Sequence, residues 1–168
     1  LGLGGLPANV ASLQDVDKSD CVVVVGGDPG VDQKVLAYIA KRAADNDGKL
    51  IVVSDQETAL TSRATETLPL KSVAKIKKAV EAAERPVVLF AAGLKESAYA
   101  TLRALPTKTK FLPLVKGTNA AGAAKLGLSA RPVKGEALLV FAGDDPMEGV
   151  SLPRAGFVVA VAAYDGKW

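Results

Sequence analysis

The sequence predicts a three-layer α/β fold in which a mainly parallel sheet carries helices on both faces. The runs at 22–25 and 138–141 are apolar at every position, as in strands that are buried on both faces. Such runs alternate along the chain with segments of helical periodicity, as in βαβ units. Both runs also lead into Gly-x-Asp-Pro, at 26–29 and 143–146. A turn of this kind at the end of a strand lies where open α/β sheets bind ligands.

The first half of the chain contains strands and helices with clear boundaries. Residues 1–19 begin with several glycines and a proline and are expected to be an irregular lead-in. Pro29 suits the first position of a helix, which should end near Gly48. A polar helical turn is expected at 58–64. The strands of this half are predicted at about 21–26, 50–53 and 68–70, and its second helix at 73–83.

The second half repeats the alternation. Arg85 and Pro86 end the helix before them, and the apolar segment 87–90 follows as a strand. Helices are expected at 96–105 and, in a Gly/Ala-rich stretch, at 117–127. The remaining strands are predicted at 111–114, 137–142 and 157–162. Because the candidate hinge at 82–86 is short, we expect one domain over 20–168 with two halves, about 20–84 and 85–168, as a fragment of a longer chain.

Composition excludes several kinds of site. The 168 residues include no histidine, and Cys21 is the only cysteine, so an iron–sulfur cluster, a structural zinc or a disulfide cannot form within this chain alone. Cys21 opens a buried strand and is expected to be a core residue. The net charge of +3 is spread over scattered lysines, which disfavours nucleic acid as a partner. No apolar run approaches the length needed to span a bilayer, so direct membrane insertion is not expected.

Polar residues near the strand ends are the candidate binding residues. Gly26, Gly27 and Asp28 fit neither the dinucleotide fingerprint nor a P-loop, so they are either a helix cap or a nucleotide-side loop. Ser54 and Asp55 follow the second strand, where nucleotide binders often place an acidic residue for a ribose.

The second half offers further candidates. Gly143, Asp144 and Asp145 follow the strand at 137–142, and the two adjacent carboxylates are either a metal site or a solvated turn. Asn119 lies in the segment 117–127, where a Gly/Ala-rich turn and a short helix are expected. We expect no metal site and no catalytic residue in this chain.

Four segments resemble the molybdopterin oxidoreductase superfamily in the same order. DCVVVVGGDP at 20–29 resembles that family's strand and Gly-x-Asn-Pro turn, and residues 49–53 and 58–70 resemble the following strand and its Thr-rich continuation. GTNAAGA at 117–123 and LLVFAGDDP at 138–146 resemble two later segments. The resemblance covers most of the chain from about residue 12 and implies a Rossmann-like domain of the molybdopterin oxidoreductase type.

Departures from the family pattern indicate one branch of it. Asp28 and Asp145 replace the asparagine of both Gly-x-Asn-Pro copies, and Ser54 to Gln56 replace an Asp-Pro-Arg that catalytic members use to hold a pterin dinucleotide. This pattern resembles the large iron–sulfur subunit of NADH–quinone oxidoreductase (respiratory complex I), in which the fold persists without the cofactor. The resemblance implies a scaffold domain that supports electron transfer from NADH to quinone without chemistry of its own.

The same resemblance implies where the chain works. Iron–sulfur clusters are expected in a missing N-terminal region, the partners are other subunits of a multi-subunit oxidoreductase, and the location is the cytoplasmic side, peripheral to the inner membrane. One alternative is the domain of a formate dehydrogenase-like molybdenum or tungsten enzyme that binds molybdopterin guanine dinucleotide. Another is the central domain of a thiamine-diphosphate enzyme, which residues 85–93 resemble locally.

Overall fold

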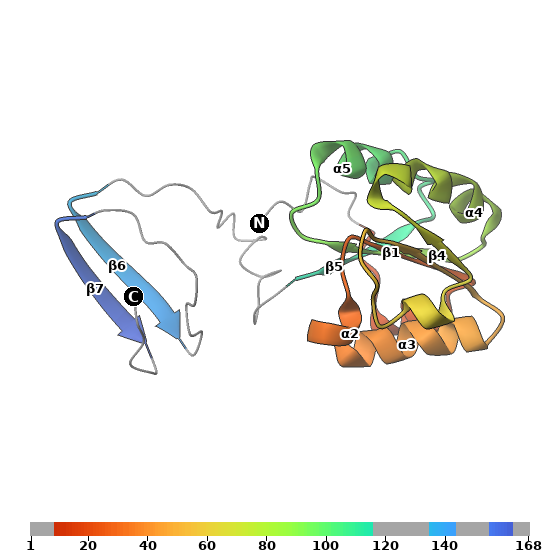
Figure 1. Ribbon diagram of the computed structural model, residues 1–168, viewed down its shortest axis with the longest axis horizontal. Coiled ribbons are helices and arrows are strands. Elements are labelled where there is room, and N and C mark those ends of the chain that lie inside the picture. Colours follow the sequence, from red (N-terminus) through yellow and green to blue (C-terminus); the bar gives the residue numbers. More distant parts are fainter. Residues whose placement is uncertain (1–8, 116–134, 144–154, 163–168) are drawn as a thin grey trace. The chain divides into compact units, whose positions relative to one another are not determined.

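The computed structural model describes residues 9–115, 135–143 and 155–162. Five strands form one sheet in the order β3-β2-β1-β4-β5, and every neighbouring pair is parallel (Figure 1). The strands are β1 (Cys21–Val25), β2 (Lys49–Val53), β3 (Glu66–Leu68), β4 (Pro86–Ala91) and β5 (Lys110–Leu114). The predicted α/β class and parallel sheet are confirmed, and the layout is compatible with a Rossmann-like fold.

Helices lie on both faces of this sheet. They are α1 (Leu13–Asp17), α2 (Pro29–Asp32), α3 (Lys34–Asp45), α4 (Ile76–Ala82) and α5 (Glu96–Arg103), with 3₁₀ segments η1 (Thr61–Arg63) and η2 (Leu70–Lys75). Two predicted helices are subdivided. The helix after Pro29 breaks at Gln33, whose backbone leaves the helical region, and the helix expected at 73–83 begins as η2. The predicted helix at 117–127 lies outside the described residues.

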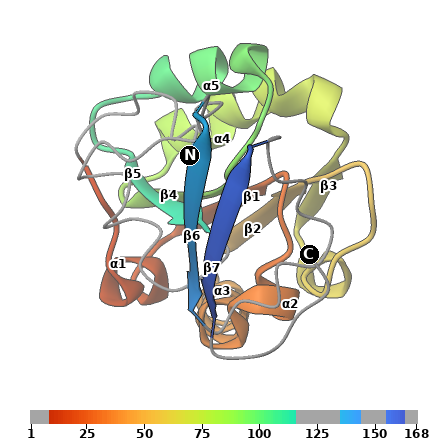
Figure 2. The same cartoon turned by 90° about the vertical axis from the view of Figure 1, so that its left-hand side faces the viewer.

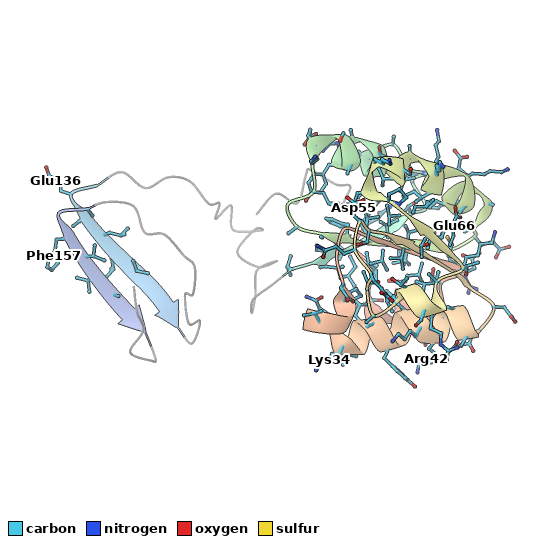
Figure 3. The ribbon with its side chains drawn as sticks, in the orientation of Figure 1. Lys34, Arg42, Asp55, Glu66, Glu136 and Phe157 are labelled. Atoms are coloured by element: carbon cyan, nitrogen blue, oxygen red, sulfur yellow. The ribbon has the colours of Figure 1, made fainter. Side chains whose placement is uncertain are left out.

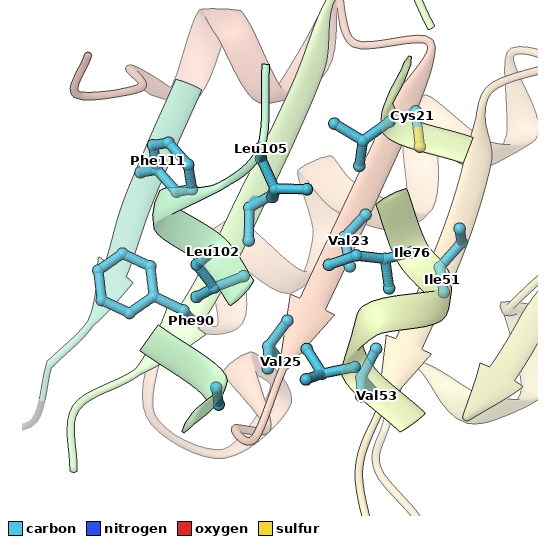
Figure 4. Packing of buried hydrophobic residues seen from close by; sticks show 14 of the residues in the cluster. Cys21, Val23, Val25, Ile51, Val53, Ile76, Phe90, Leu102, Leu105 and Phe111 are labelled. Carbon is cyan, nitrogen blue, oxygen red and sulfur yellow. The ribbon is translucent and has the colours of Figure 1, made fainter. Parts of the chain in front are cut away.

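The core consists of two apolar layers separated by the sheet. In β1, Cys21, Val23 and Val25 face one layer, while Val22 and Val24 face the other, and each of these side chains is at most 1% exposed. Helices α4 and α5 cover the first layer (Figure 4), and α1 and α3 cover the second (Figure 2). The apolar run at 22–25 therefore marks a strand buried on both faces, as predicted.

Polar groups just before β1 fasten the start of the sheet. The carboxylate of Asp20 accepts hydrogen bonds from the backbone N–H groups of Glu84 (2.6 Å) and Arg85 (2.8 Å). The hydroxyl of Ser19 donates to the carbonyl oxygen of Arg85 at 2.8 Å. These contacts join β1 to the turn before β4 across the segment that the sequence offered as a hinge, so the sheet continues through the boundary between the two predicted halves.

The lead-in contains regular structure that the sequence analysis missed. Residues 13–17 form α1, whose N-terminus is a capping box: the Ser12 hydroxyl accepts from the Asp15 N–H, and the Asp15 carboxylate accepts from the Ser12 N–H. The expectation of an irregular segment was therefore wrong for residues 13–17. The Ser-x-x-Asp spacing was the available signal, because a side chain that satisfies N-terminal amides makes a short helix favourable.

The five-stranded sheet ends at β5 because the outer edge of that strand is closed. Phe111 donates to the carbonyl of Asn9 and accepts from the N–H of Ala11, both at 2.8 Å. Alternate residues of a strand present their backbone groups to the same side, so Pro113 also faces outward, and it has no N–H to donate. The outward carbonyl of Val115 accepts from the Gln33 side chain at 2.9 Å.

The strands β6 (Ala137–Gly143) and β7 (Phe157–Ala162) form a separate parallel pair. Their extents match the predicted strands at 137–142 and 157–162, but we expected them to extend the main sheet, buried on both faces. Leu139 is instead 57% exposed and Phe157 64% exposed. An apolar run indicates that a strand needs cover but does not identify the sheet that supplies it, and β5 has a closed edge.

The chain divides into two compact units, residues 1–128 and 129–168. The five-stranded sheet belongs to the first unit, and β6 and β7 belong to the second. Within the described ranges, no helix is both long enough and apolar enough to cross a membrane.

Replacing Asp20 by asparagine should lower the free energy of unfolding at pH 7 by about 1–2 kcal/mol, because two backbone amides lose a charged acceptor. Burial opposes ionisation of Asp20, but the amides of Glu84 and Arg85 outweigh it, so its pKa lies below the ordinary value of 3.8. A lowered carboxyl pKa adds stability that is complete above pH 3.8 and is lost as the pH falls through the folded-state pKa. Urea unfolding from pH 7 to pH 2 measures both effects.

Asp47 provides the matched control for this variant. Its carboxylate is exposed and has no hydrogen-bond partner among the residues described, and its backbone φ of 65° is one that asparagine also tolerates. Asp47→Asn should change stability by less than about 0.5 kcal/mol. Equal losses for the two variants would contradict the assigned role of Asp20.

Candidate functional site

The candidate site is the edge of the main sheet where its parallel strands end. The amide of Gly26 donates to the carbonyl of Val53 at 2.8 Å, which places the turn after β1 beside the end of β2. The structure thus brings Gly26, Gly27 and Asp28 together with Ser54 and Asp55 at one edge. This is the position at which open α/β sheets bind their ligands.

Asp28 uses both of its carboxylate oxygens on the backbone of this chain. Oδ1 accepts from the N–H of Gly30 at 2.8 Å, and Oδ2 accepts from the N–H of Ala59 at 3.0 Å. Asp28 is the N-cap of α2, and Pro29 occupies the first helical position, so the helix-cap interpretation of this turn is confirmed. A Cβ on Gly30 would lie 2.3 Å from the Cβ of Ala59, which shows how closely the two loops pack.

The two glycines before Asp28 are packed against side chains of neighbouring loops. Gly26 has a φ of +72°, and a Cβ there would come within 2.4 Å of a Leu94 methyl group. A Cβ on Gly27 would come within 2.8 Å of a Leu114 methyl group. Gly26 is therefore favoured by its positive φ, whereas a side chain at Gly27 would require the end of the Leu114 side chain to shift.

Ser54 and Asp55 also make contacts within the chain. The Ser54 hydroxyl accepts from the N–H of Gln56 at 3.1 Å, and Oδ1 of Asp55 accepts from the N–H of Leu70 at 2.9 Å. Asp55 is exposed and joins the end of β2 to the start of η2 (Figure 3). The carboxylate that could serve a ribose is thus engaged with the backbone.

The remaining sequence candidates are not brought to this edge. Gly143 is the last residue of β6 and belongs to the separate two-stranded sheet. Asn119, Asp144 and Asp145 lie outside the described residues, as does the rest of the second Gly-x-Asp-Pro turn. We expected the strands before both Gly-x-Asp-Pro turns to belong to one sheet, but in the described ranges β6 pairs only with β7, in a separate sheet from β1.

A second concave region lies at the opposite edge of the sheet, near the starts of β4 and β5. It has a volume of about 290 Å³ and is lined by charged residues. Lys110 forms an ion pair with Asp15, and the Lys108 ammonium donates to the carbonyl oxygens of Glu81 and Ala83. Hydrogen bonds and charge from Lys110 hold the pKa of Asp15 below its ordinary value. These lysines therefore fasten the fold together.

Cys21 has the environment of a core residue. Its side chain is fully buried, and burial raises the pKa of the thiol to about 11, with a smaller contribution from the neighbouring Asp20 carboxylate. In the part of the chain that the structure describes, no three residues of the metal-binding types His, Cys, Asp and Glu are grouped to hold an ion.

No family model matches the chain, and no curated protein matches it. The functional argument therefore rests on the fold, the contacts at the sheet edge and the sequence resemblance. At that edge, the side chains of Asp28, Ser54 and Asp55 are engaged with the backbone of the chain, which is an arrangement that stabilises loops.

Two substitutions of Asp28 should separate the contribution of its hydrogen bonds to stability from that of its negative charge. Asp28→Ala removes both acceptors and should lower the free energy of unfolding by about 1–2 kcal/mol. Asp28→Asn keeps one acceptor oxygen for the Gly30 amide and should cost less than half as much. Chemical denaturation of the two variants measures the difference. A larger loss for the asparagine variant would contradict the capping role.

Native Cys21 should react slowly with a thiol reagent at pH 8. Only the thiolate reacts, and a pKa of about 11 leaves on the order of one thiol in a thousand ionised, in a side chain that is fully buried. Ser97→Cys on the exposed start of α5 is the control and should react at least about 100-fold faster. Comparable rates for Cys21 and the control would overturn the core assignment.

Proposed function

We propose that this chain is a scaffold domain of the large iron–sulfur subunit of an NADH–quinone oxidoreductase. In this role it supports electron transfer from NADH to quinone without chemistry of its own. The proposal rests on the resemblance of four ordered segments to the molybdopterin oxidoreductase superfamily. The single observation that carries it is the double hydrogen bond of Asp28 to the amides of Gly30 and Ala59.

The position of Asp28 argues against a bound pyrophosphate at this edge. Backbone N–H groups at the start of a helix hold such an anion in dinucleotide-binding folds. Here the carboxylate of Asp28 already accepts from two of the amides in this region. Two like charges about 4 Å apart repel by about 4 kcal/mol at an effective dielectric constant of 20, which corresponds to about a 1000-fold loss of affinity.

The packing of the turn argues in the same direction. Leu94 and Leu114 approach Gly26 and Gly27 so closely that even a methyl group on either glycine would collide with them. The turn is therefore packed against other parts of the chain at both glycines. At the end of β2, Ser54 supplies no carboxylate for a ribose or guanine. A dinucleotide would thus lose an attractive carboxylate at the end of β2 and meet a repulsive one, Asp28, at the end of β1.

The same proposal implies where the iron–sulfur clusters, the partner subunits and the membrane lie relative to this chain. The iron–sulfur clusters of such a subunit would lie outside residues 1–168, since one cysteine cannot hold a cluster. The partners would be other subunits of the oxidoreductase, on the cytoplasmic side and peripheral to the inner membrane. Residues 9–115 would contribute a stable folded body to that assembly.

Metal analysis and pterin fluorescence on the intact purified subunit test the proposal. We expect no stoichiometric molybdenum or tungsten and no released pterin, because the edge that would hold a pterin dinucleotide is occupied by the chain's own groups. Iron and sulfide should be present in cluster stoichiometry. Stoichiometric molybdenum or tungsten together with pterin would instead favour the formate dehydrogenase-like alternative.

A turnover measurement on the assembled complex provides the matched test. Asp28→Asn should leave NADH–quinone turnover per complex within about twofold, because Asp28 contacts only the backbone of its own domain. A complex in which this variant is fully assembled yet loses most of its turnover would contradict a scaffold role.

A further inference from the structure

Among the described residues of the first unit, apolar side chains lie exposed around one groove. An apolar groove of about 550 Å³ is formed by Leu13 of α1, Val31 of α2, Val35 and Leu36 of α3, and Leu112 and Pro113 of β5. Leu13 is 48% exposed, Val31 65% and Val35 67%. Exposed apolar side chains are common singly, but a group of them around one groove marks an interaction surface.

Helix α3 carries two apolar stripes, and the core uses only one of them. Its buried stripe contains Leu36, Ala37, Ala40 and Ala43. Val35 and Tyr38 are three residues apart, so they share a face, and they are 67% and 64% exposed. A helix that only covers a sheet needs one apolar stripe, with polar residues opposite. Val35 lines the groove, whereas the guanidinium of Arg42 lies over the Tyr38 ring, 5.8 Å from its centroid. Val35 is therefore the part of this second face that is left for another element to cover.

The backbone beside the groove cannot accept a strand. The outward groups of Phe111 are bonded to Asn9 and Ala11, Pro113 has no N–H, and the Val115 carbonyl accepts from Gln33. A strand laid along this edge would leave most of its own backbone groups unpaired, which is costly when they are buried. A helix satisfies its backbone internally and can fill the groove with side chains alone. The occupant that fits is therefore helical.

The charge at the rim of the groove is positive. Lys34 lines the groove, and no ion pair or hydrogen bond of its ammonium is found in the described part of the chain. By contrast, Arg42 further along α3 is paired with Asp17 (Figure 3 labels Lys34 and Arg42). The first turn of α3 holds no acidic residue, although a cation is disfavoured at that end of a helix. An acidic residue beside Lys34 would complement this charge.

We propose that the apolar groove binds an amphipathic α-helix of a partner protein, with its apolar stripe against Leu13, Val31 and Val35 and a carboxylate beside Lys34. Helix-in-groove recognition of this kind uses apolar anchors spaced three and four residues apart. The proposal does not depend on the scaffold function, because it rests on the exposed stripe of α3, the closed edge of β5 and the charge of Lys34.

Binding of two designed peptides to the purified full chain tests this proposal. Each is a 20-residue alanine-rich helix with leucines at helical spacing, and it carries either a glutamate or a lysine at both ends of the leucine stripe. Fluorescence anisotropy gives the affinities. The acidic peptide should bind the unmodified chain at least about tenfold more tightly than the basic one, because Lys34 attracts one and repels the other.

Two substitutions locate the binding site. Val35→Lys should weaken the acidic peptide at least about tenfold, because it places a charge in the apolar groove. Lys34→Glu should reverse the preference, so that the basic peptide binds more tightly than the acidic one. Ala100→Lys and Lys95→Glu are the matched controls, since both residues are exposed at α5 on the opposite face of the sheet, and neither should alter binding.

Three results would overturn the proposal. They are failure of the acidic peptide to bind, equal effects of the groove and control substitutions, and an unchanged preference in Lys34→Glu. Sedimentation velocity of the chain alone tests whether a second copy of the chain occupies the groove. A dimer that Val35→Lys dissociates would assign the groove to a second copy of the chain and not to a partner helix. Because Val35 and Lys34 are exposed, circular dichroism and urea unfolding of the variants should match those of the unmodified chain.

Discussion

The fold of the first unit depends on the complete burial of β1. This strand lies at the centre of a five-stranded parallel sheet, and its side chains alternate between two apolar layers, so it can form only when helices cover both faces. The polar groups just before it, Ser19 and Asp20, hold the turn that starts β4, which fixes the register of the two central strands. Because all five strands run the same way, the loops after β1, β2 and β4 are brought to one edge. The candidate site is therefore a consequence of how β1 is buried.

Parts of this arrangement could be predicted because they depend on local chemistry. Strands β1 and β4 are uniformly apolar, and β2 is apolar after Lys49. Asp28 followed by Pro29 is a helix start that can be recognised from the sequence alone. The capping box at Ser12 was equally local and was overlooked among glycines and a proline. Other features depend on distant residues. The Asp28 carboxylate also accepts a hydrogen bond from the N–H of Ala59, which is 31 positions away. This contact depends on how two loops pack, and no spacing in the sequence indicates it.

The edge of the sheet shows the same limit. The apolar runs at 137–143 and 157–162 resemble further strands of a parallel sheet, and as strands they were predicted with nearly the correct bounds. Whether they join β5 depends on what already occupies its outer edge. Asn9 and Ala11 pair with Phe111, and Pro113 cannot donate, so the edge is closed by residues about 100 positions apart in the chain. An apolar run indicates that a strand must be buried. It does not indicate which other strands have a free edge with which it can pair.

These contacts separate two kinds of surface on the first unit. At the carboxyl edge of the sheet, the polar side chains that chemistry would require, Asp28, Ser54 and Asp55, have partners in the backbone, and the glycines are packed against leucines. Around α3, apolar side chains and Lys34 lie exposed beside a strand edge that accepts no further strand. Satisfied polar groups stabilise a loop but leave little to bind a ligand, whereas exposed apolar groups gain free energy only when another surface covers them. This contrast is the basis of the proposed scaffold role and of the proposed helix-binding groove.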